Sequence, residues 1–335
     1  MNKYDLVKKV FERDINRKAI SIRKCDNLTF NINDVYVIEA EDKLYILKVF
    51  HATEYPERGK MVYISKKLAE HSIPHAKIYS YNRNDNDFQG GYIIEEYLPG
   101  KTVDRLKLTE NETCSMYKKL AVMMSEIHQI KFTRFGFIVG GMPDCKTFTE
   151  HIHNEFIYGN HYIHSAFTNA ELSKIKSILI ERLKPCDEMQ PCLCHFDVQP
   201  KNILAHGDCI TLIDWDDARS FPAVVDIARL TLLIELAYDN EKAEESEKTI
   251  IYRKAFLDYY STDYGLRSYY DYEILLHVWH GLVLLNYCRD DIPQFDKIKA
   301  VVDKKIQHIT KEHYLTSGYT SHNKRFSEMA VGVET

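Results

Sequence analysis

The sequence predicts an α+β protein of two lobes, a small one built on an antiparallel sheet and a larger, mostly helical one. Three observations support this. The first hundred residues show the apolar alternation of strands, the residues from Leu120 onward show helical periodicity, and a Pro99-Gly100 break lies between them. We expect lobes over residues 1–98 and 99–315 and a loose tail over 316–335, which lacks periodicity.

The first lobe is predicted to contain two helices and two pairs of strands. Glu41-Asp42 separates two apolar alternating runs and is typical of a hairpin turn. Lys48 lies in the second of these runs, where a period of two directs it away from the faces of Leu47 and Val49. The predicted helices cover residues 1–14 and 57–71, and the predicted strands cover 35–40, 43–50, 76–81 and 91–97.

The second lobe is predicted from helical periodicity and one capping signal. Thr168-Asn169-Ala170-Glu171 has the Thr-x-x-Glu pattern of a capping box and predicts that a helix begins there. Four apolar-periodic stretches follow Asp226 and end near Leu315. The other predicted helices cover residues 120–130, 148–158 and 168–183.

The segment from His195 to Asn202 carries the clearest chemical signal. It has the pattern His-x-Asp-x-x-x-x-Asn, and Asp214 follows after an apolar run. Phosphoryl transfer from a nucleotide needs a carboxylate for the attacking hydroxyl and oxygen ligands for magnesium. Asp197 suits the first task, and Asn202 and Asp214 suit the second, because Mg²⁺ prefers hard oxygen donors. The alternative is that Asp197 is only a turn residue and Asp214 only a helix cap. That alternative does not explain why both acids flank apolar runs.

Two further groups fit a nucleotide site. Lys48 on its strand can reach the α- and β-phosphates of a nucleotide below the sheet, whereas by itself it would be an ordinary exposed strand lysine. The connector Glu96-Tyr97-Leu98 precedes the Pro99-Gly100 break. We expect an adenine ring against the backbone of this connector, which fits a crevice between lobes.

The order and spacing of these residues resemble the aminoglycoside phosphotransferase and choline kinase family, which shares the protein-kinase fold. The resemblance covers roughly residues 20 to 290 and is strongest over residues 194–230. It implies a two-lobed protein-kinase-like fold with Asp197 as catalytic base, Asn202 and Asp214 as metal ligands, and Lys48 as phosphate clamp. It also implies ATP (or GTP) and Mg²⁺ as cofactors.

Two departures from the family pattern bear on the nucleotide site. The nucleotide-covering loop should lie near residues 26–33, yet it contains no glycine; Thr29 and Asn33 could add side-chain contacts to phosphate there. The helix-borne Glu that pairs with the strand lysine should fall near Met61 or Val62. Neither side chain can form an ion pair, so either Glu57, one turn earlier, or no residue is expected to pair with Lys48.

The acceptor is predicted to be a small molecule. Only eleven residues separate Asp214 from Asp226, too few for the long activation segment of a protein kinase, and no Ala-Pro-Glu signature follows. Residues 234–291 carry twelve acids against six bases and are rich in Tyr, which suits a cationic acceptor. A solvated acidic helix with aromatic packing explains the same composition.

Composition limits the remaining possibilities. A net charge of −5 argues against a general nucleic-acid binder, and no apolar run approaches a membrane span. The amino-terminal residues show no signal-peptide core, and the eight cysteines are scattered, so we expect a cytoplasmic protein with reduced thiols, monomeric or homodimeric. Cys192-x-Cys194 is interpreted as core packing, because no second Cys/His pair has zinc-finger spacing.

The leading hypothesis is an ATP-dependent O-phosphotransferase with a cationic or polyhydroxylated acceptor, such as an aminoglycoside-type antibiotic, which would make the protein an antibiotic-resistance factor. A metabolic kinase for choline, homoserine or a thiosugar is a close alternative. A third is a non-catalytic protein on a kinase fold, like the spore-coat relatives of this family. The intact Asp197, Asn202 and Asp214 favour an enzyme.

Overall fold

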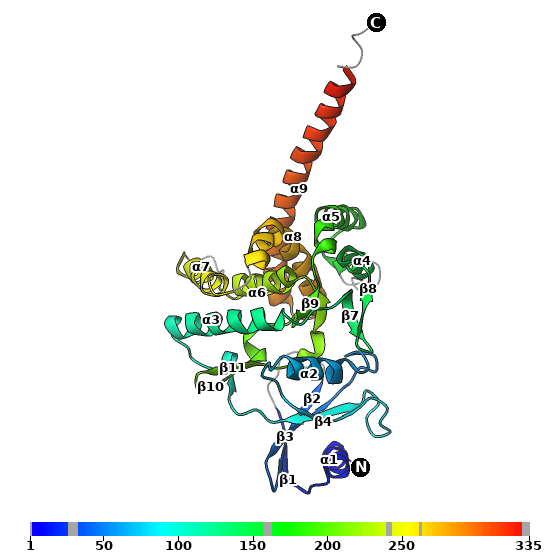
Figure 1. Ribbon diagram of the computed structural model, residues 1–335, viewed down its shortest axis with the longest axis vertical. Coiled ribbons are helices and arrows are strands. Elements are labelled where there is room, and N and C mark those ends of the chain that lie inside the picture. Colours follow the sequence, from blue (N-terminus) through cyan, green and yellow to red (C-terminus); the bar gives the residue numbers. More distant parts are fainter. Residues whose placement is uncertain (1, 26–32, 157–162, 239–242, 261–262, 330–335) are drawn as a thin grey trace. The chain divides into compact units, whose positions relative to one another are not determined.

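The computed structural model describes residues 2–25, 33–156, 163–238, 243–260 and 263–329 (Figure 1). The chain forms two compact units. The first comprises residues 1–144, 192–220 and 258–261, and the second comprises residues 145–191, 221–257 and 262–335. This division keeps the segment from His195 to Asp214 with the amino-terminal sheet. The two compact units therefore differ from the two expected lobes, whose boundary at residues 98 and 99 stays a prediction.

A five-stranded antiparallel sheet organises the amino-terminal part, in the order β1-β2-β3-β5-β4. The hairpin at Glu41-Asp42 is confirmed, because β2 and β3 pair in antiparallel register and Lys48 lies opposite Val35. The first strand was not predicted. The strands are β1 (Ala19–Lys24), β2 (Asp34–Ala40), β3 (Leu44–Val49), β4 (Ile78–Asn82) and β5 (Tyr92–Glu96).

Helix α1 (Lys3–Ile15) covers one face of this sheet, and apolar residues lie between the helix and that face. Its buried residues Val7, Val10 and Phe11 pack in one cluster with Leu47 and other apolar residues of β2, β3 and β5. Figure 1 shows α1 and helix α2 (Lys60–Glu70) on opposite sides of the strands. Since strand side chains alternate, Lys48 points away from the α1 cluster, as predicted.

Helix α2 begins later than expected because Gly59 interrupts the predicted helix. Gly59 has a φ of 77° and is the residue before the first turn, which begins at Lys60. The left-handed region favours glycine, because other residues meet a steric penalty there. Lys60, Met61, Ile64 and Leu68 form the buried side of α2.

Two smaller sheets complete the first unit and support the catalytic segment. The order β11-β10-β6 joins the connector to the strands after Asn202, since Leu204 pairs with Thr102. Gly100 is required there: a Cβ at this position would lie 2.5 Å from the carbonyl oxygen of Ala205. The strands are β6 (Lys101–Thr102), β10 (Ile203–His206) and β11 (Cys209–Leu212), and a second sheet orders β8 (Met142–Cys145), β7 (Phe135–Val139), β12 (Arg219–Phe221) and β9 (Cys192–Cys194).

Helix α3 (Glu110–Ile127) begins ten residues before the predicted helix. Thr109 caps it, because its side chain accepts from the Glu112 backbone while the Glu112 carboxylate accepts from the Thr109 backbone. This capping box is the signal that was overlooked in the sequence.

The second unit is helical, as predicted. Thr168 forms the expected capping box with Glu171, and helix α5 starts directly after it. The four stretches expected after Asp226 correspond to helices α6 to α9, the first of which already begins at Ala223. The helices are α4 (Phe148–Asn154), α5 (Asn169–Arg182), α6 (Ala223–Tyr238), α7 (Ala243–Leu257), α8 (Asp263–Tyr287) and α9 (Ile292–Met329).

The predicted loose tail over residues 316–335 stays a prediction, although part of its backbone is described. Helix α9 continues through Met329, so the backbone of residues 316–329 is helical, and residues 330–335 lie outside the described range. The segment lacks an apolar stripe, which is the reason that periodicity gave no helix there. Across the described residues, no helix combines the length and the apolar character that crossing a membrane requires.

Candidate active site

The segment after β9 is held by its own backbone and by His195. Phe196 has a φ of 66°, so the chain turns sharply there. His195 bonds through Nε2 to the Ile213 carbonyl at 3.0 Å, and its Nδ1 accepts from the Asp197 amide at 3.3 Å. The amide of Ile213 in turn donates to the Asn202 carbonyl at 3.0 Å. These bonds join the two parts of the sequence motif, which lie on either side of the β10–β11 hairpin.

Asp197 is oriented by two amide side chains. Asn202 Nδ2 donates to Asp197 Oδ2 at 2.7 Å and to the Asp197 carbonyl at 2.9 Å, and Gln199 Nε2 donates to Asp197 Oδ1 at 2.6 Å. A carboxylate fixed in this way is partly exposed and ready to accept a further hydrogen bond. This geometry suits a base that receives a proton from a bound hydroxyl.

Asp214 meets the lysine of β3. Its backbone has a φ of 65°, an uncommon conformation for a residue other than glycine and one that is frequent at functional sites. Lys48 Nζ lies 2.8 Å from Asp214 Oδ1. The Asp214 side chain is 42% exposed, whereas that of Lys48 is 9% exposed. Residues 166 positions apart in the chain are therefore brought into direct contact, as the motif predicts for one site.

The residues predicted to bind metal fit that task. Asn202 donates its Nδ2 to Asp197, while its Oδ1 receives no hydrogen bond from the described part of the chain. Asp214 uses Oδ1 for Lys48, and its Oδ2 is likewise without a partner among the described residues. One amide oxygen and one carboxylate oxygen are thus available, and both are hard donors of the kind that Mg²⁺ prefers.

The electrostatics around Lys48 are dominated by three acids. Burial opposes the charge of Lys48, but Asp214 and Asp216 outweigh it and raise the pKa of the ammonium. Burial raises the pKa of Glu95 to about 7, and it raises the pKa of Asp216 together with the negative charge of Asp214. Three acids share one lysine, so the site has an excess of negative charge that a bound cation would neutralise.

Glu57 is not the partner of Lys48, and that expectation is corrected. Glu57 Oε2 lies 2.9 Å from Lys60 Nζ. Lys48 forms its ion pairs with Asp214 and Asp216 instead. The physical reason is local: Glu57 precedes the first turn of α2, beside the buried Lys60, which needs a neutralising charge.

Asp216 was missed by sequence reasoning. Its Oδ1 lies 3.1 Å from Lys48 Nζ, and its Oδ2 accepts from Asn33 Nδ2 at 3.0 Å. The available signal was the cluster of acids Asp214, Asp216 and Asp217 directly after the apolar run that ends at Ile213. The contact of Asn33 with phosphate stays a prediction. The side-chain amide of Asn33 already donates one hydrogen bond to Asp216.

The other expected nucleotide contacts stay predictions. Thr29 lies outside the described residues. In the connector, the Glu96 amide donates to the Lys77 carbonyl at 2.8 Å, so that group is already used. Tyr97 and Leu98 are half-buried and follow the end of β5.

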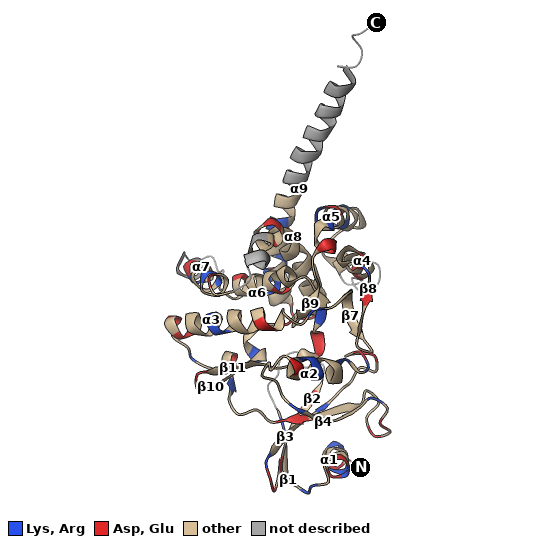
Figure 2. Ribbon diagram, in the orientation of Figure 1, with Lys and Arg blue, Asp and Glu red and all other residues tan. Residues whose placement is uncertain are grey.

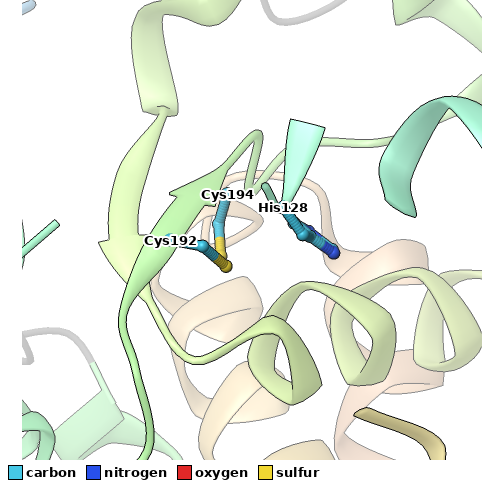
Figure 3. A group of neighbouring side chains, drawn as sticks. All are labelled: His128, Cys192 and Cys194. Atoms are coloured by element: carbon cyan, nitrogen blue, oxygen red, sulfur yellow. The ribbon is translucent and has the colours of Figure 1, made fainter. Parts of the chain in front are cut away.

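A second group of potential ligands includes the two cysteines of β9, which directly precedes the catalytic segment in the sequence (Figure 3). His128, Cys192 and Cys194 are buried, and their ligand atoms lie within 4.8 Å of one another. His128 Nδ1 is 2.5 Å from the Tyr260 hydroxyl. Structural zinc sites use four ligands, and no fourth Cys, His or carboxylate joins this group in the described chain. We interpret the group as core packing, as expected for Cys192 and Cys194.

Two acids of the acidic region over residues 234–291 are paired with bases of neighbouring helices. Glu235 lies 2.9 Å from Lys305 Nζ, and Glu273 pairs with Arg253. Tyr269 is buried and donates to Thr231 Oγ1 at 3.1 Å. These acids and this tyrosine are structural, so the hypothesis of an acidic, aromatic acceptor site loses them. Acidic and basic residues are also interspersed along α1 and α5 (Figure 2).

The chain belongs to the phosphotransferase enzyme family, whose model matches residues 31–272. It is therefore a kinase-type phosphotransferase that acts on hydroxyl groups of small molecules. A comparison with curated proteins gives no match.

Solved structures show the same protein-kinase-like fold at low identity. The aminoglycoside phosphotransferase APH(4)-Ia gives a TM-score of 0.65 at 16% identity, covering 91% of this chain and 99% of that one. The choline kinase LicA from Streptococcus pneumoniae gives 0.62 at 17%, covering 91% and 99%. An ethanolamine kinase from Plasmodium vivax gives 0.59 at 17%, covering 91% and 90%.

Proposed function

We propose that this protein transfers the γ-phosphate of ATP to a hydroxyl of a cationic or polyhydroxylated small molecule. One observation carries the proposal. A continuous set of contacts links Lys48 to Asp214 and, through the Ile213–Asn202 backbone bond, to Asp197. Each chemical group that phosphoryl transfer requires of the protein is present in this set.

The residues divide the work by their surroundings. Asp197 orients the acceptor hydroxyl and takes its proton, because Gln199 and Asn202 fix both of its oxygens. Lys48 places a positive charge at the nucleotide phosphates. Asn202 Oδ1 and Asp214 Oδ2 would hold Mg²⁺, which when bound neutralises charge on the phosphates.

The acceptor class follows from shared chemistry. A variant of the APH(4)-Ia enzyme was crystallised with ADP and hygromycin B, and other structures of similar fold are choline and ethanolamine kinases. Aminoglycosides, choline and ethanolamine all join a hydroxyl to a positive charge. The TM-scores of the three kinases differ by only 0.06, so they do not choose between these acceptors. We propose aminoglycoside-type antibiotics as the first candidates and amino alcohols as the second.

An acceptor panel tests this proposal. ADP release is measured with ATP or GTP, magnesium, and aminoglycosides, choline, ethanolamine, homoserine or a thiosugar. We expect one cationic acceptor to stimulate ADP release, and Asp197→Asn to lower kcat by about 10²- to 10⁴-fold, since that is the usual contribution of a general base. EDTA should abolish turnover.

Asp208→Asn is the matched control. Asp208 lies in the turn between β10 and β11, its side chain is fully exposed, and it contacts only Lys119 in the described chain. Its kcat should stay within about twofold of the parent, because exposed ion pairs contribute little. Nucleotide binding without ADP release for any acceptor would favour a non-catalytic kinase-fold protein. Equal turnover by Asp197→Asn and the parent would remove Asp197 from the base role.

A further inference from the structure

The nucleotide lysine of this protein receives no carboxylate from helix α2. At the two positions where the family resemblance places a Glu, Met61 is buried and Val62 is exposed. Glu57 is paired with Lys60. A lysine on a flexible four-carbon stem needs a fixed counter-charge to hold its ammonium at one point. Another residue must therefore supply that charge in this chain.

Asp216 has the position and the support for this role. It is 6% exposed, and its Oδ1 lies 3.1 Å from Lys48 Nζ. Asn33 Nδ2 donates to the other carboxylate oxygen at 3.0 Å, which prevents the group from rotating. Lys60 Nζ donates to the Asp216 carbonyl at 2.6 Å, so α2 fixes the backbone of Asp216 rather than Lys48 itself.

The two other acids near Lys48 are less suited. Asp214 contacts Lys48 at 2.8 Å, but it is 42% exposed and its oxygens are those predicted to bind metal. Glu95 on β5 forms no ion pair with Lys48 in the described chain, and burial raises its pKa to about 7. Of the three acids, Asp216 alone is both buried and in direct contact with Lys48.

We propose that Asp216 is a positioning residue that replaces the helix-borne Glu, so that its carboxylate holds Lys48 Nζ for contact with nucleotide phosphates. This inference rests on the proposed function. Helix α2 then acts on the lysine indirectly, through the Lys60 bond to the Asp216 backbone. In place of an ion pair between a strand and a helix, Lys48 of β3 then pairs with Asp216 in the turn after Asp214.

The first test compares neighbouring acids. In Asp216→Asn, we expect KM for ATP to rise by about 10- to 100-fold, the usual range for a lost hydrogen bond to a charged group. Asp217→Asn is the matched control, since Asp217 accepts from the Tyr55 hydroxyl at 2.7 Å and does not contact Lys48. Its KM should stay within about twofold. Equal KM values for a folded Asp216→Asn and the parent overturn the proposal.

A double-mutant cycle shows whether Asp216 acts through Lys48. Lys48→Met alone and Lys48→Met with Asp216→Asn should have the same KM for ATP, because the second change removes nothing that remains. A general structural role predicts that the two effects multiply. Multiplied effects in folded proteins therefore overturn the proposal.

Nucleotide binding separates this inference from the proposed function and from a metal role. Calorimetry with ADP needs no acceptor, so it applies even if no acceptor is ever phosphorylated. We expect Asp216→Asn to weaken ADP binding in magnesium and in EDTA alike. Weakening in magnesium only would make Asp216 a metal ligand and overturn the proposal. Should Asp216→Asn fail to fold, Asp216→Glu keeps the charge, and its ADP affinity should exceed that of Lys48→Met; equal affinities count against the idea.

Discussion

One buried polar site in each compact unit shows a different way of burying such groups. Around Lys48, the first unit keeps charges and pairs them: the ammonium has two carboxylates within 3.1 Å. In the second unit, helix α8 buries His277 and His280 completely, and burial lowers the pKa of both, so both are neutral at pH 7. The buried charges beside Lys48 are therefore paired with one another, whereas the two buried imidazoles of α8 are neutral.

The difference explains which unit carries recognisable sequence signals. A retained buried charge needs a specific partner, so Asp197, Asn202 and Asp214 stand at fixed spacings around short strands. The two neutral imidazoles of α8 need no partner of opposite charge. Thr231, for example, bonds His277 Nε2 at 2.9 Å and accepts from Tyr269.

The largest expected stability effect lies in the second unit. Trp279 is buried, its ring centroid lies 5.3 Å from Phe148 and 5.7 Å from Phe221, and its Nε1 donates to Glu155 at 2.9 Å. Trp279→Ala should lower the free energy of unfolding by about 3–5 kcal/mol, the usual result of removing a buried aromatic residue. Urea unfolding followed by far-UV circular dichroism measures it.

The two tryptophans of the chain make the comparison sharper. Trp215 belongs to the first unit, next to His195, and Trp279 belongs to the second. Trp279→Phe keeps an aromatic ring and should lose less stability than Trp279→Ala, while the fluorescence of Trp215 reports the first unit. A change below about 0.5 kcal/mol for Trp279→Ala, as for a surface site, contradicts the packing described for this core.

The next effect is a pH dependence that arises from the neutral histidines. Burial lowers the pKa of His280 to about 3, whereas an unfolded histidine has a pKa of 6.5. Below pH 6.5 the unfolded state binds a proton that the folded state does not, so stability falls as pH falls from 6.5 toward 3. From pH 7 to pH 5, each such histidine should cost about 2 kcal/mol.

The charged groups near His277 favour this direction. Glu235 and Glu273 lie 3.6 and 3.8 Å from its ring nitrogens, but Lys305 and Arg253 neutralise them. Urea midpoints from pH 5 to pH 7.5 measure the slope. His280→Gln should reduce the slope of the unfolding free energy against pH by the equivalent of about one bound proton. His206→Gln, at an exposed strand end, is the control and should leave the slope unchanged. An unchanged slope in His280→Gln would show that this histidine is protonated in the folded protein.

Local patterns in the sequence predicted much of the fold, and they assigned Lys48 and Asp214 to one site before their contact was seen. The β2–β3 hairpin and the direction of Lys48 followed from period-two alternation, and the motif brought Lys48 and Asp214 together. The contact of Lys48 with Asp216 did not follow, because the motif assigns a role to Asp214 and none to Asp216. Apolar periodicity places the start of α2 too early, because the left-handed backbone of Gly59 delays the helix to Lys60.

The smallest expected effect compares one motif in both units. Thr109 begins α3 in the first unit and Thr168 begins α5 in the second, and each forms a complete capping box with the Glu three residues later. Thr168→Ala and Thr109→Ala should each lower the free energy of unfolding by about 1 kcal/mol, because each leaves a first-turn amide without its acceptor. Thr→Ser at either site keeps the hydroxyl and should cost less than half as much. Since the bonds are alike, with the Thr hydroxyl 3.3 Å from the Glu amide in both, unequal losses in urea unfolding would show that the two units do not contribute equally to the measured transition.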